Sequence, residues 1–229
     1  MWIRLACILS LIFALPSYGR AAGPDDSLLA YAVGVNGGAG IYLGKGLVLS
    51  VAHVVGGGIL NKPKVIIAGQ TLTATVVKES PFEQLDLVLL EVNEEGLPVS
   101  LRLRRIPLCQ GQPWPGEEVV SLSAQGPVRS RVLSPKGLPS GVKRFSTVIR
   151  DVATTGNSGS GVFDAQRKCL LGIMSRKISQ VGVQKATGTK TTLDIAKYFV
   201  PASTIADFMP AQLRLMPESN PPIQFSNRQ

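Results

Sequence analysis

The sequence is poor in histidine, in aromatic residues and in long apolar runs. One histidine, His53, occurs among the 229 residues, so any mechanism that requires an imidazole must use it. The apolar run Leu5–Leu15 has 11 residues, too few to cross a hydrocarbon core of about 30 Å as a helix. Gly (24) and Pro (16) make the chain turn-rich, but below the level typical of disorder. These features exclude a disordered chain, a collagen, a coiled coil and a polytopic membrane protein.

The N-terminus has the pattern of a secretory signal peptide. One positive charge in Met1–Arg4 is followed by the short apolar run and then by small residues up to Ala22. This order is typical of export signals. We therefore expect residues 1–22 to be a signal peptide, cut after Gly19, Ala21 or Ala22, and the protein to be periplasmic or secreted. An uncleaved anchor or a buried first helix is the alternative.

Removal of this segment changes the charge and the cysteine count. The formal charge falls from +9 to +7 because Arg4 and Arg20 are lost. Cys7 is lost as well, which leaves Cys109 and Cys169 as an even pair. In an oxidising compartment such a pair can persist as a disulfide. Two unpaired, buried thiols are the equally weighted alternative.

The rest of the chain is typical of an all-β protein. Short segments rich in Val, Ile, Leu and Thr are separated by Gly, Pro, Asn or Ser, which favours many short strands in a sandwich or barrel. Only Ser203–Met209 has a helical pattern, with a Ser or Thr cap and Pro210 as a stop. The predicted strands are Lys64–Ala68, Leu72–Lys78, Leu87–Val92, Glu118–Leu122, Thr147–Arg150 and Leu170–Ser175.

A segment with two prolines around Trp114 divides the mature chain into halves that each suit a six-stranded barrel. We predict an N-terminal antiparallel β-barrel over residues 23–105 and a linker over 106–116. A C-terminal antiparallel β-barrel with the short helix follows over 117–209. Residues 210–229, rich in Pro, Asn, Ser and Gln, are expected to be a loose tail.

Three strings carry candidate chemistry. His53 follows an apolar strand-like run in LVLSVAHVV, and Asp86 directly precedes another in LDLVLLEV. A carboxylate in that place is unfavourable to bury without a donor, and an imidazole N–H would supply one. If each residue is considered alone, the alternative for His53 is a core histidine whose hydrogen bonds are satisfied. The alternative for Asp86 is an aspartate that caps a turn at the start of a strand.

The third string, TGNSGSGVF, contains Ser158 among glycines. Glycines allow positive φ and close backbone approach, so such a turn can direct several N–H groups to one point as an anion-binding nest. Ser158 would then have an exposed hydroxyl beside oxyanion donors. An ordinary glycine-rich hairpin loop is the alternative for this string alone.

The three strings, in the order His, Asp, Ser, resemble the trypsin-like (chymotrypsin-fold) serine peptidases, especially their bacterial and Deg-type branch. The segments CLLGIMS (169–175) and YFVPASTI (198–205) also resemble that family, so the likeness extends over roughly residues 28–210. It implies two six-stranded antiparallel β-barrels with an active site between them, a polypeptide substrate, and neither a cofactor nor a metal. The chain after residue 210 is too short for the peptide-binding PDZ module that many Deg-type members carry.

The resemblance also implies a role for each residue. Ser158 would attack the carbonyl, His53 would transfer the proton, and Asp86 would orient the imidazole. The N–H groups of Gly156 and Ser158 would bind the oxyanion. Asn157 stands where vertebrate digestive members carry the aspartate that engages a freed N-terminus, so activity is expected not to require such a cut.

The predicted substrate pocket lacks the charged or polar residues that some members of the family have there. Val152 stands at its expected base, and Ala153 and Met174 lack the polar groups of glutamate-specific members. With Ser175 as a further pocket residue, a small or apolar side chain is expected before the cleaved bond. Arg176 and Lys177 follow on the strand that pairs with substrate in the family, either favouring acidic groups there or serving as solvated surface charge.

Two other classes of function compete with an endopeptidase. One is a catalytically silent member that acts as a binding or structural module. The other is a polyanion-binding protein, suggested by basic residues. Aromatic residues make up only 6%, the basic residues are dispersed and export is predicted, so no nucleic-acid partner is expected. The basic residues in question are Arg102, Arg104, Arg105, Lys136, Lys143 and Arg144.

Overall fold

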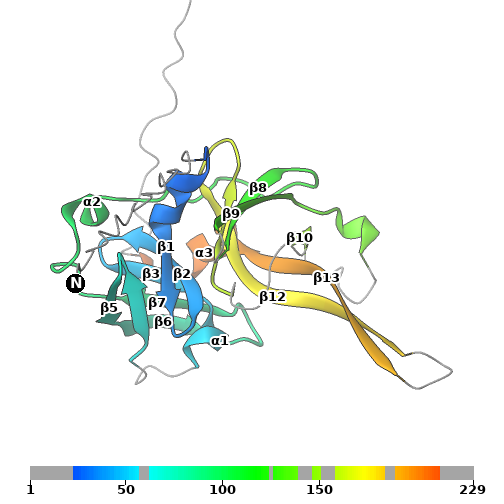
Figure 1. Cartoon of the computed structure of the whole chain (residues 1–229), viewed down its shortest axis with the longest axis horizontal. Coiled ribbons are helices and arrows are strands. Elements are labelled where there is room, and N and C mark those ends of the chain that lie inside the picture. Colours follow the sequence, from blue (N-terminus) through cyan, green and yellow to red (C-terminus); the bar gives the residue numbers. More distant parts are fainter. Residues whose placement is uncertain are drawn as a thin grey trace, which may run out of the picture.

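The computed structural model describes residues 23–56, 62–123, 126–138, 146–150, 158–183 and 189–211. The chain forms two curled antiparallel sheets and a short C-terminal helix (Figure 1). The predicted all-β, two-barrel fold is thereby confirmed. The predicted signal peptide, residues 1–22, and residues 212–229 of the predicted tail lie outside the described residues.

The strands of the first sheet precede those of the second along the chain. The first sheet contains β1 (Ala32–Val35), β2 (Gly38–Gly44), β3 (Leu47–Ser50), β4 (Lys64–Ile67), β5 (Gln70–Thr73), β6 (Thr75–Ser80) and β7 (Leu87–Glu91). The second contains β8 (Glu118–Ser123), β9 (Gly126–Arg131), β10 (Val148–Arg150), β11 (Gly161–Asp164), β12 (Leu170–Val183) and β13 (Lys190–Pro201). The helical elements are η1 (Asp26–Tyr31), α1 (Ala52–Val55), α2 (Val99–Arg102), η2 (Pro135–Gly137) and α3 (Ala202–Phe208).

The first sheet has seven strands, one more than the six predicted, in the order β5-β4-β1-β2-β3-β7-β6. Its two outermost strands, β5 and β6, are joined by Ala74 alone. The sheet must therefore curl until its edges meet, which makes it a barrel. The predicted strand Leu72–Lys78 divides here because the chain turns this corner: Ala74 is fully buried and its N–H donates to the carbonyl of Pro63 at 2.9 Å.

The second sheet has six strands in the order β10-β13-β12-β11-β8-β9. An antiparallel bridge between Val132 and Ile149 brings the ends of β9 and β10 together. The N–H of Leu133 extends this contact by donating to the carbonyl of Val148 at 2.8 Å. The two outermost strands of this sheet thus also meet, and the sheet closes as the first one does.

One apolar cluster joins the two barrels. It contains Ile41 and Leu49 of the first sheet, Val120 and Phe163 of the second, and Ile205 of α3. Full burial of an aliphatic or aromatic side chain of this size contributes about 1.5–3 kcal/mol. The cluster therefore fixes the position of one barrel relative to the other. It also fixes the geometry of any site at their junction.

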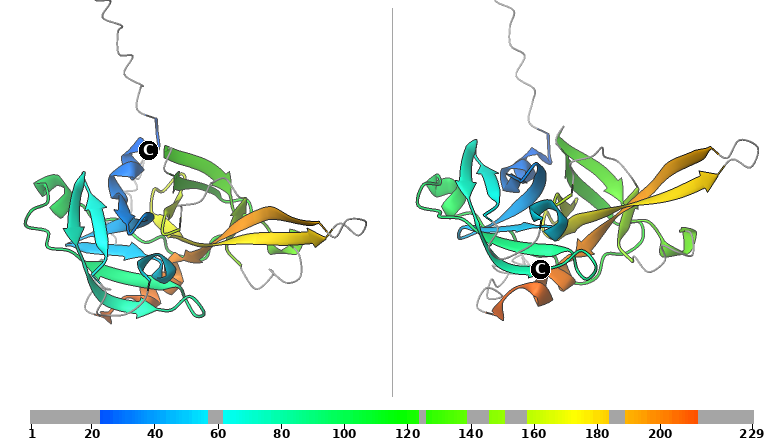
Figure 2. Two further views of the ribbon diagram at one scale, coloured as in Figure 1. Left: turned by 60° about the horizontal axis from the view of Figure 1, so that its bottom comes forward. Right: turned by 90° about the horizontal axis from the view of Figure 1, so that it is seen from below.

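Strands β12 and β13 are much longer than the sequence suggested. The prediction ended this strand at Ser175, whereas β12 continues to Val183 and pairs with β13 as far as Val183↔Lys190. The outer part of the pair leaves the barrel as a ribbon, seen in yellow and orange in Figure 2. Polar residues such as Ser179 and Thr192 on this ribbon are exposed, which is why apolar patterning did not indicate its length.

The helices are short. Helix α3 begins at Ala202, one residue before the predicted start, and its N-cap position is Pro201 without a side-chain cap. The one-turn helices α1 and α2 were not predicted. None of the helices in the described part of the chain is long and apolar enough to cross a membrane.

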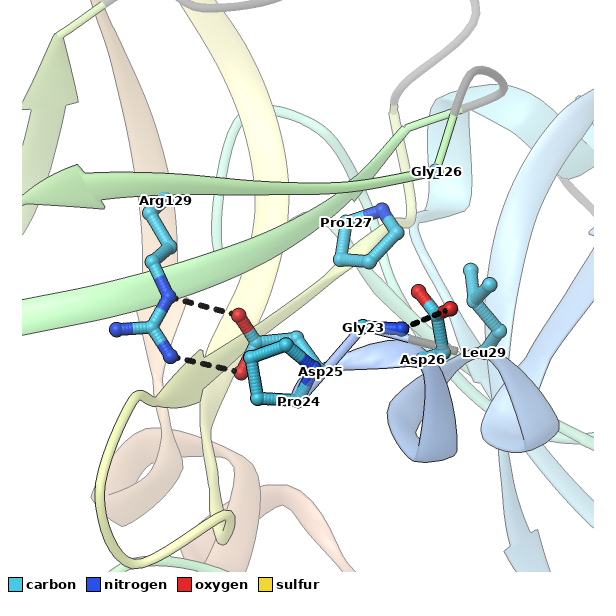
Figure 3. Close-up of a pocket in the computed structure, with 8 residues that line it drawn as sticks. All are labelled: Gly23, Pro24, Asp25, Asp26, Leu29, Gly126, Pro127 and Arg129. Carbon is cyan, nitrogen blue, oxygen red and sulfur yellow. Dashed lines mark hydrogen bonds and ion pairs between the residues drawn. The ribbon is translucent and has the colours of Figure 1, made fainter. Parts of the chain in front are cut away.

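The disulfide and the first described residues tie distant segments together. Cys109 in the predicted linker is bonded to Cys169, just before β12. At the other end of the chain, the carboxylate of Asp25 binds Arg129 of β9, with an Nε–Oδ2 distance of 2.7 Å (Figure 3). The same carboxylate also binds the ammonium of Lys168. The hydrogen bond from Arg129, together with Lys168, holds the pKa of Asp25 below its ordinary value. These contacts fasten the N-terminal segment to the second barrel.

Candidate active site

His53 lies on the short helix α1, directly after β3. The turn consists of four residues, ends at Gly56 with φ +84°, and presents the histidine at the edge of the first barrel. Glycine takes this left-handed conformation without the penalty that a Cβ atom brings. The His53 side chain is 33% exposed, so one side of its ring faces the protein and the ring can also be reached from solvent.

Asp86 lies immediately before β7 and is held in an unusual backbone conformation. It is fully buried, and its φ is +55°. Positive φ is uncommon outside glycine, although aspartate tolerates it better than most residues. Its N–H donates to the carbonyl of Pro81 at 3.0 Å. Such strained positions persist where the surrounding structure fixes them, and they are concentrated at functional sites.

The Asp86 carboxylate is surrounded by hydrogen-bond donors. Nδ1 of His53 is 2.9 Å from Oδ2 and the backbone N of His53 is 3.1 Å from Oδ1. The hydroxyl of Ser175 donates to Oδ2 at 2.6 Å. These bonds compensate for the burial of the carboxylate. An ionised carboxylate only accepts hydrogen bonds, so in the tautomer that donates to Asp86 the proton of His53 is on Nδ1 and the lone pair is on Nε2.

Ser158 stands at the start of a tight turn that reaches into the first barrel. Its carbonyl accepts the N–H of Ala39 at 2.9 Å, and the N–H of Gly159 donates to the carbonyl of Met174 at 2.8 Å. Gly159 has φ +88°, and a Cβ atom there would lie 1.9 Å from the Ala39 carbonyl oxygen. Only glycine fits this approach. Ser158 itself is partly exposed.

Gly38 shows that the histidine segment and the serine turn meet at one place. A Cβ atom at Gly38 would lie 2.8 Å from Val54, the residue after His53, and 3.3 Å from the carbonyl oxygen of Ser158. Close by, the buried hydroxyl of Ser50 donates to the carbonyl of Ala39 at 2.7 Å. The structure therefore brings the regions of His53, Asp86 and Ser158 together at the junction of the barrels.

An aromatic ring and a guanidinium cover one side of this junction. The ring of Phe82 meets the His53 ring edge-on, with 5.6 Å between centroids and an interplanar angle of 85°. Arg176 lies over Phe82 at 4.2 Å and donates to the Phe82 carbonyl at 2.7 Å. Tyr198 lies near Asp86 and Arg176, and burial raises the pKa of its phenol. Arg176 thus connects β12 with the segment that precedes Asp86.

Several of the predicted site residues either lie outside the described residues or make contacts that the sequence did not predict. Val152, Ala153 and Gly156 lie outside the described residues. Met174 is buried in the core of the second barrel. Ser175, expected in the substrate pocket, is buried and donates to Asp86; the sequence did not predict this role. Phe82 was also missed, since nothing in the sequence distinguishes it from other surface aromatic residues.

The site contains side chains suited to acid–base and nucleophilic chemistry. Among the described residues, no group of three or more His, Cys, Asp or Glu side chains could hold a metal ion. A cavity of about 410 Å³ lies elsewhere, between the N-terminal segment and β9, and its lining includes Asp25 and Arg129 but not His53, Asp86 or Ser158 (Figure 3). An imidazole oriented by a buried carboxylate can act as a general base toward a hydroxyl.

A known protein family and several solved structures resemble this chain. The family model of the trypsin-like peptidase domain matches residues 38–173. Among curated proteins, none matches the chain.

Solved structures share the fold at low sequence identity. The Rv3671c protease from M. tuberculosis in its active form is 18% identical, with a TM-score of 0.56 over 88% of this chain and 92% of that one. The MamO protease domain from Magnetospirillum magneticum is 20% identical, with a TM-score of 0.53 over 80% and 97%. The serine endoprotease from Yersinia pestis is 15% identical, with a TM-score of 0.56 over 82% of this chain and 65% of that one.

Proposed function

Because the chain belongs to the trypsin-like peptidase family, we propose that it is a serine endopeptidase that hydrolyses peptide bonds through a triad of Ser158, His53 and Asp86. The observation that carries this proposal is the environment of Asp86. A fully buried carboxylate lies 2.9 Å from Nδ1 of the only histidine in the chain. An aspartate with a purely structural role needs a hydrogen-bond donor, but that donor does not have to be a side chain that is open to solvent.

The reaction begins with attack of the Ser158 hydroxyl oxygen on the substrate carbonyl carbon. Nε2 of His53 takes the hydroxyl proton and then delivers it to the leaving amine, while Asp86 stabilises the imidazolium. The backbone N–H groups of Gly156 and Ser158 bind the oxyanion, a contribution of typically about 10²–10³ in kcat for each donor. Water then hydrolyses the acyl-enzyme with the same proton transfers.

The proposal extends to substrate and location. The substrate is a polypeptide, and Val152 and Ala153 favour a small or apolar side chain before the cleaved bond. The protein is exported, as the signal-like segment 1–22 indicates. Since Asn157 cannot form the ion pair of the digestive members, activity does not require a particular N-terminus. A mature protein extended by a few residues is expected to retain its activity, measured on the same peptide.

The test is cleavage of a peptide library by the mature protein. Wild type is compared with Ser158→Ala and His53→Ala, and the fold of each is checked by thermal unfolding. We expect cleavage by wild type only, mainly after small or apolar residues. Cleavage mainly after Arg or Lys would contradict the proposed pocket. No cleavage by a folded wild type would contradict the enzyme and favour a silent binding module.

A further inference from the structure

The outer part of the β12–β13 ribbon has few neighbours. It extends beyond the rest of the molecule in both views of Figure 2. Within the described residues, β10 borders β13 only from Ala196 to Tyr198, and β11 borders β12 only up to Ile173. Among the parts of the chain that the structure describes, β12 is therefore paired from Ile178 to Val183 on one side only, with β13. A two-stranded ribbon is marginally stable in water, and a third strand would stabilise it.

The β12 edge lacks the usual protection against pairing. Natural edge strands carry lysine, other charges or proline, which prevent another chain from adding to the sheet. Residues Ile178–Val183 include no charged residue and no proline, whereas β13 carries Lys190 and Asp194 over the same stretch. Val181 is 58% exposed. This edge is therefore suited to accept an added strand.

The same strand begins at the proposed catalytic centre. The N–H of Met174 donates to the carbonyl of Ser160 at 2.8 Å, which places β12 beside the serine turn. The next residue, Ser175, contacts Asp86. The chain then passes Arg176 and Lys177 and becomes the ribbon. A polypeptide with its scissile bond at Ser158 would thus lie at one end of the β12 edge, which has register shifts after Met174 and after Ile178.

We propose that the β12 edge from Ile178 to Val183 binds the substrate, which adds there as a third, antiparallel strand. This inference rests on the proposed peptidase activity and names its substrate class: long, unfolded polypeptide segments. Because β12 runs away from Ser158, an antiparallel partner runs toward it. The bound residues therefore precede the scissile bond.

The length and chemistry of the site follow from strand geometry. Six residues of β12 extend over about 20 Å at about 3.3 Å per residue. Main-chain hydrogen bonds supply the affinity in this mode of recognition, and alternate side chains face the ribbon. The site therefore accepts many sequences but requires an extended backbone. Short peptides and folded segments do not use it.

The first test measures binding without cleavage. Fluorescein-labelled peptides with about 4, 8 or 12 residues before the cleaved position are titrated against Ser158→Ala by fluorescence anisotropy. We expect the affinity to rise about tenfold from the shortest to the longest peptide, since each main-chain hydrogen bond contributes a modest net gain. The same residues added after the cleaved position are the matched control and give no rise. N-methylation of alternate residues in the N-terminal extension of the peptide removes main-chain N–H donors. It is expected to abolish the gain in affinity, although the protein is the same.

The second test shortens the ribbon. Residues 179–195 are replaced by Asn-Gly in wild type and in Ser158→Ala, so that the paired residues Ile178 and Ala196 are joined by a tight turn. Shortened wild type is expected to cleave the shortest peptide at an unchanged rate, because the barrels and Ser175 are retained. Shortened Ser158→Ala is expected to lose the length-dependent affinity.

Two results would overturn the ribbon site. One is an affinity that is independent of peptide length, or a gain that survives N-methylation or shortening. The other is concentration-dependent dimerisation that disappears on shortening, without any length effect, which would make the edge a contact between copies of this chain. If wild type cleaves no peptide while Ser158→Ala shows the length effect, the ribbon site stands and the proposed activity fails.

Discussion

The buried carboxylate of Asp86 lies 2.9 Å from Nδ1 of His53 and accepts the hydroxyl of Ser175 at 2.6 Å on the same oxygen, Oδ2. His53 and Asp86 belong to the first barrel, whereas Ser175 lies on β12 of the second. The histidine is therefore oriented by contacts from both barrels. This relationship makes the geometry of the site depend on how the barrels pack.

Loss of the Ser175 hydroxyl should weaken catalysis more than binding. Ser175→Ala removes one donor from a buried carboxylate, and hydrogen bonds to charged groups contribute about 1.5–3 kcal/mol. We expect kcat on a short peptide to fall about tenfold or more, with KM nearly unchanged. Ser179→Ala is the control, because that exposed hydroxyl binds Asp194 on the ribbon. Equal kinetics for Ser175→Ala and wild type would show that Asp86 does not depend on this contact.

The turn after Ser158 should tolerate no side chain. Gly159→Ala places a Cβ atom 1.9 Å from the Ala39 carbonyl oxygen at φ +88°, and we expect loss of activity and a clear drop in the unfolding free energy. Gly116→Ala is a matched control, since its φ is +90° and no atom lies within 4 Å of the added Cβ. The control should lose only about 1–2 kcal/mol, the penalty of the left-handed conformation. Similar urea midpoints for the two variants would contradict this account of the turn.

The Asp25 ion pairs should contribute stability that depends on pH. Arg129 and Lys168 lower the pKa of Asp25 in the folded protein. A lowered folded pKa stabilises the protein above the unfolded value, and this stability is lost as pH falls through the folded pKa. Asp25→Asn should therefore be less stable than wild type near neutral pH, and the difference should vanish in acid. Urea unfolding from neutral to acidic pH measures this.

A second carboxylate provides the control for the pH series. Glu118 pairs with Arg131, and both side chains are exposed, so Glu118→Gln should change stability little at any pH. A stability difference between Asp25→Asn and wild type that stays constant with pH would indicate lost packing rather than lost charge pairing.

The disulfide should be a large contributor to stability. Cys109 and Cys169 are 60 residues apart, and closing a loop of that length in the unfolded chain stabilises the folded state by about 4 kcal/mol. The double variant Cys109→Ala/Cys169→Ala should show this loss in urea unfolding. Reduction of wild type should lower its stability in the same direction, while the same reductant leaves the double variant unchanged. A variant as stable as wild type would contradict this prediction.

Four of the six strands predicted from local apolar patterns match strands of the structure closely. The predictions Lys64–Ala68 and Leu87–Val92 match β4 and β7 to within one residue at their ends, because Val, Ile and Leu there fill a barrel interior. The break at Ala74 was not predicted, since it arises from barrel closure and from a bond to Pro63. The ribbon was missed because described side chains of its outer half, such as Ser179 and Thr192, are exposed and polar and give no apolar pattern.

Some features of the candidate site can likewise be predicted from local sequence, whereas others depend on contacts between residues far apart in the chain. His53, Asp86 and Ser158 stand in strings with a recognisable order. The contact of Ser175 with Asp86 joins residues 89 apart in sequence, and the cover of His53 by Phe82 depends on Arg176 from the other barrel. Neither contact leaves a sequence signal, because each depends on how two separately formed barrels are placed against each other.

The most direct test of the central claim is labelling by a fluorophosphonate, which reacts with an activated serine hydroxyl. The labelled residue is identified by mass spectrometry in wild type, Ser158→Ala and Ser160→Ala, the last being a control two positions along the same turn. The proposed triad predicts a single label on Ser158, absent from Ser158→Ala and retained in Ser160→Ala. A folded wild type that takes up no label, or takes it up on another serine, would contradict the account.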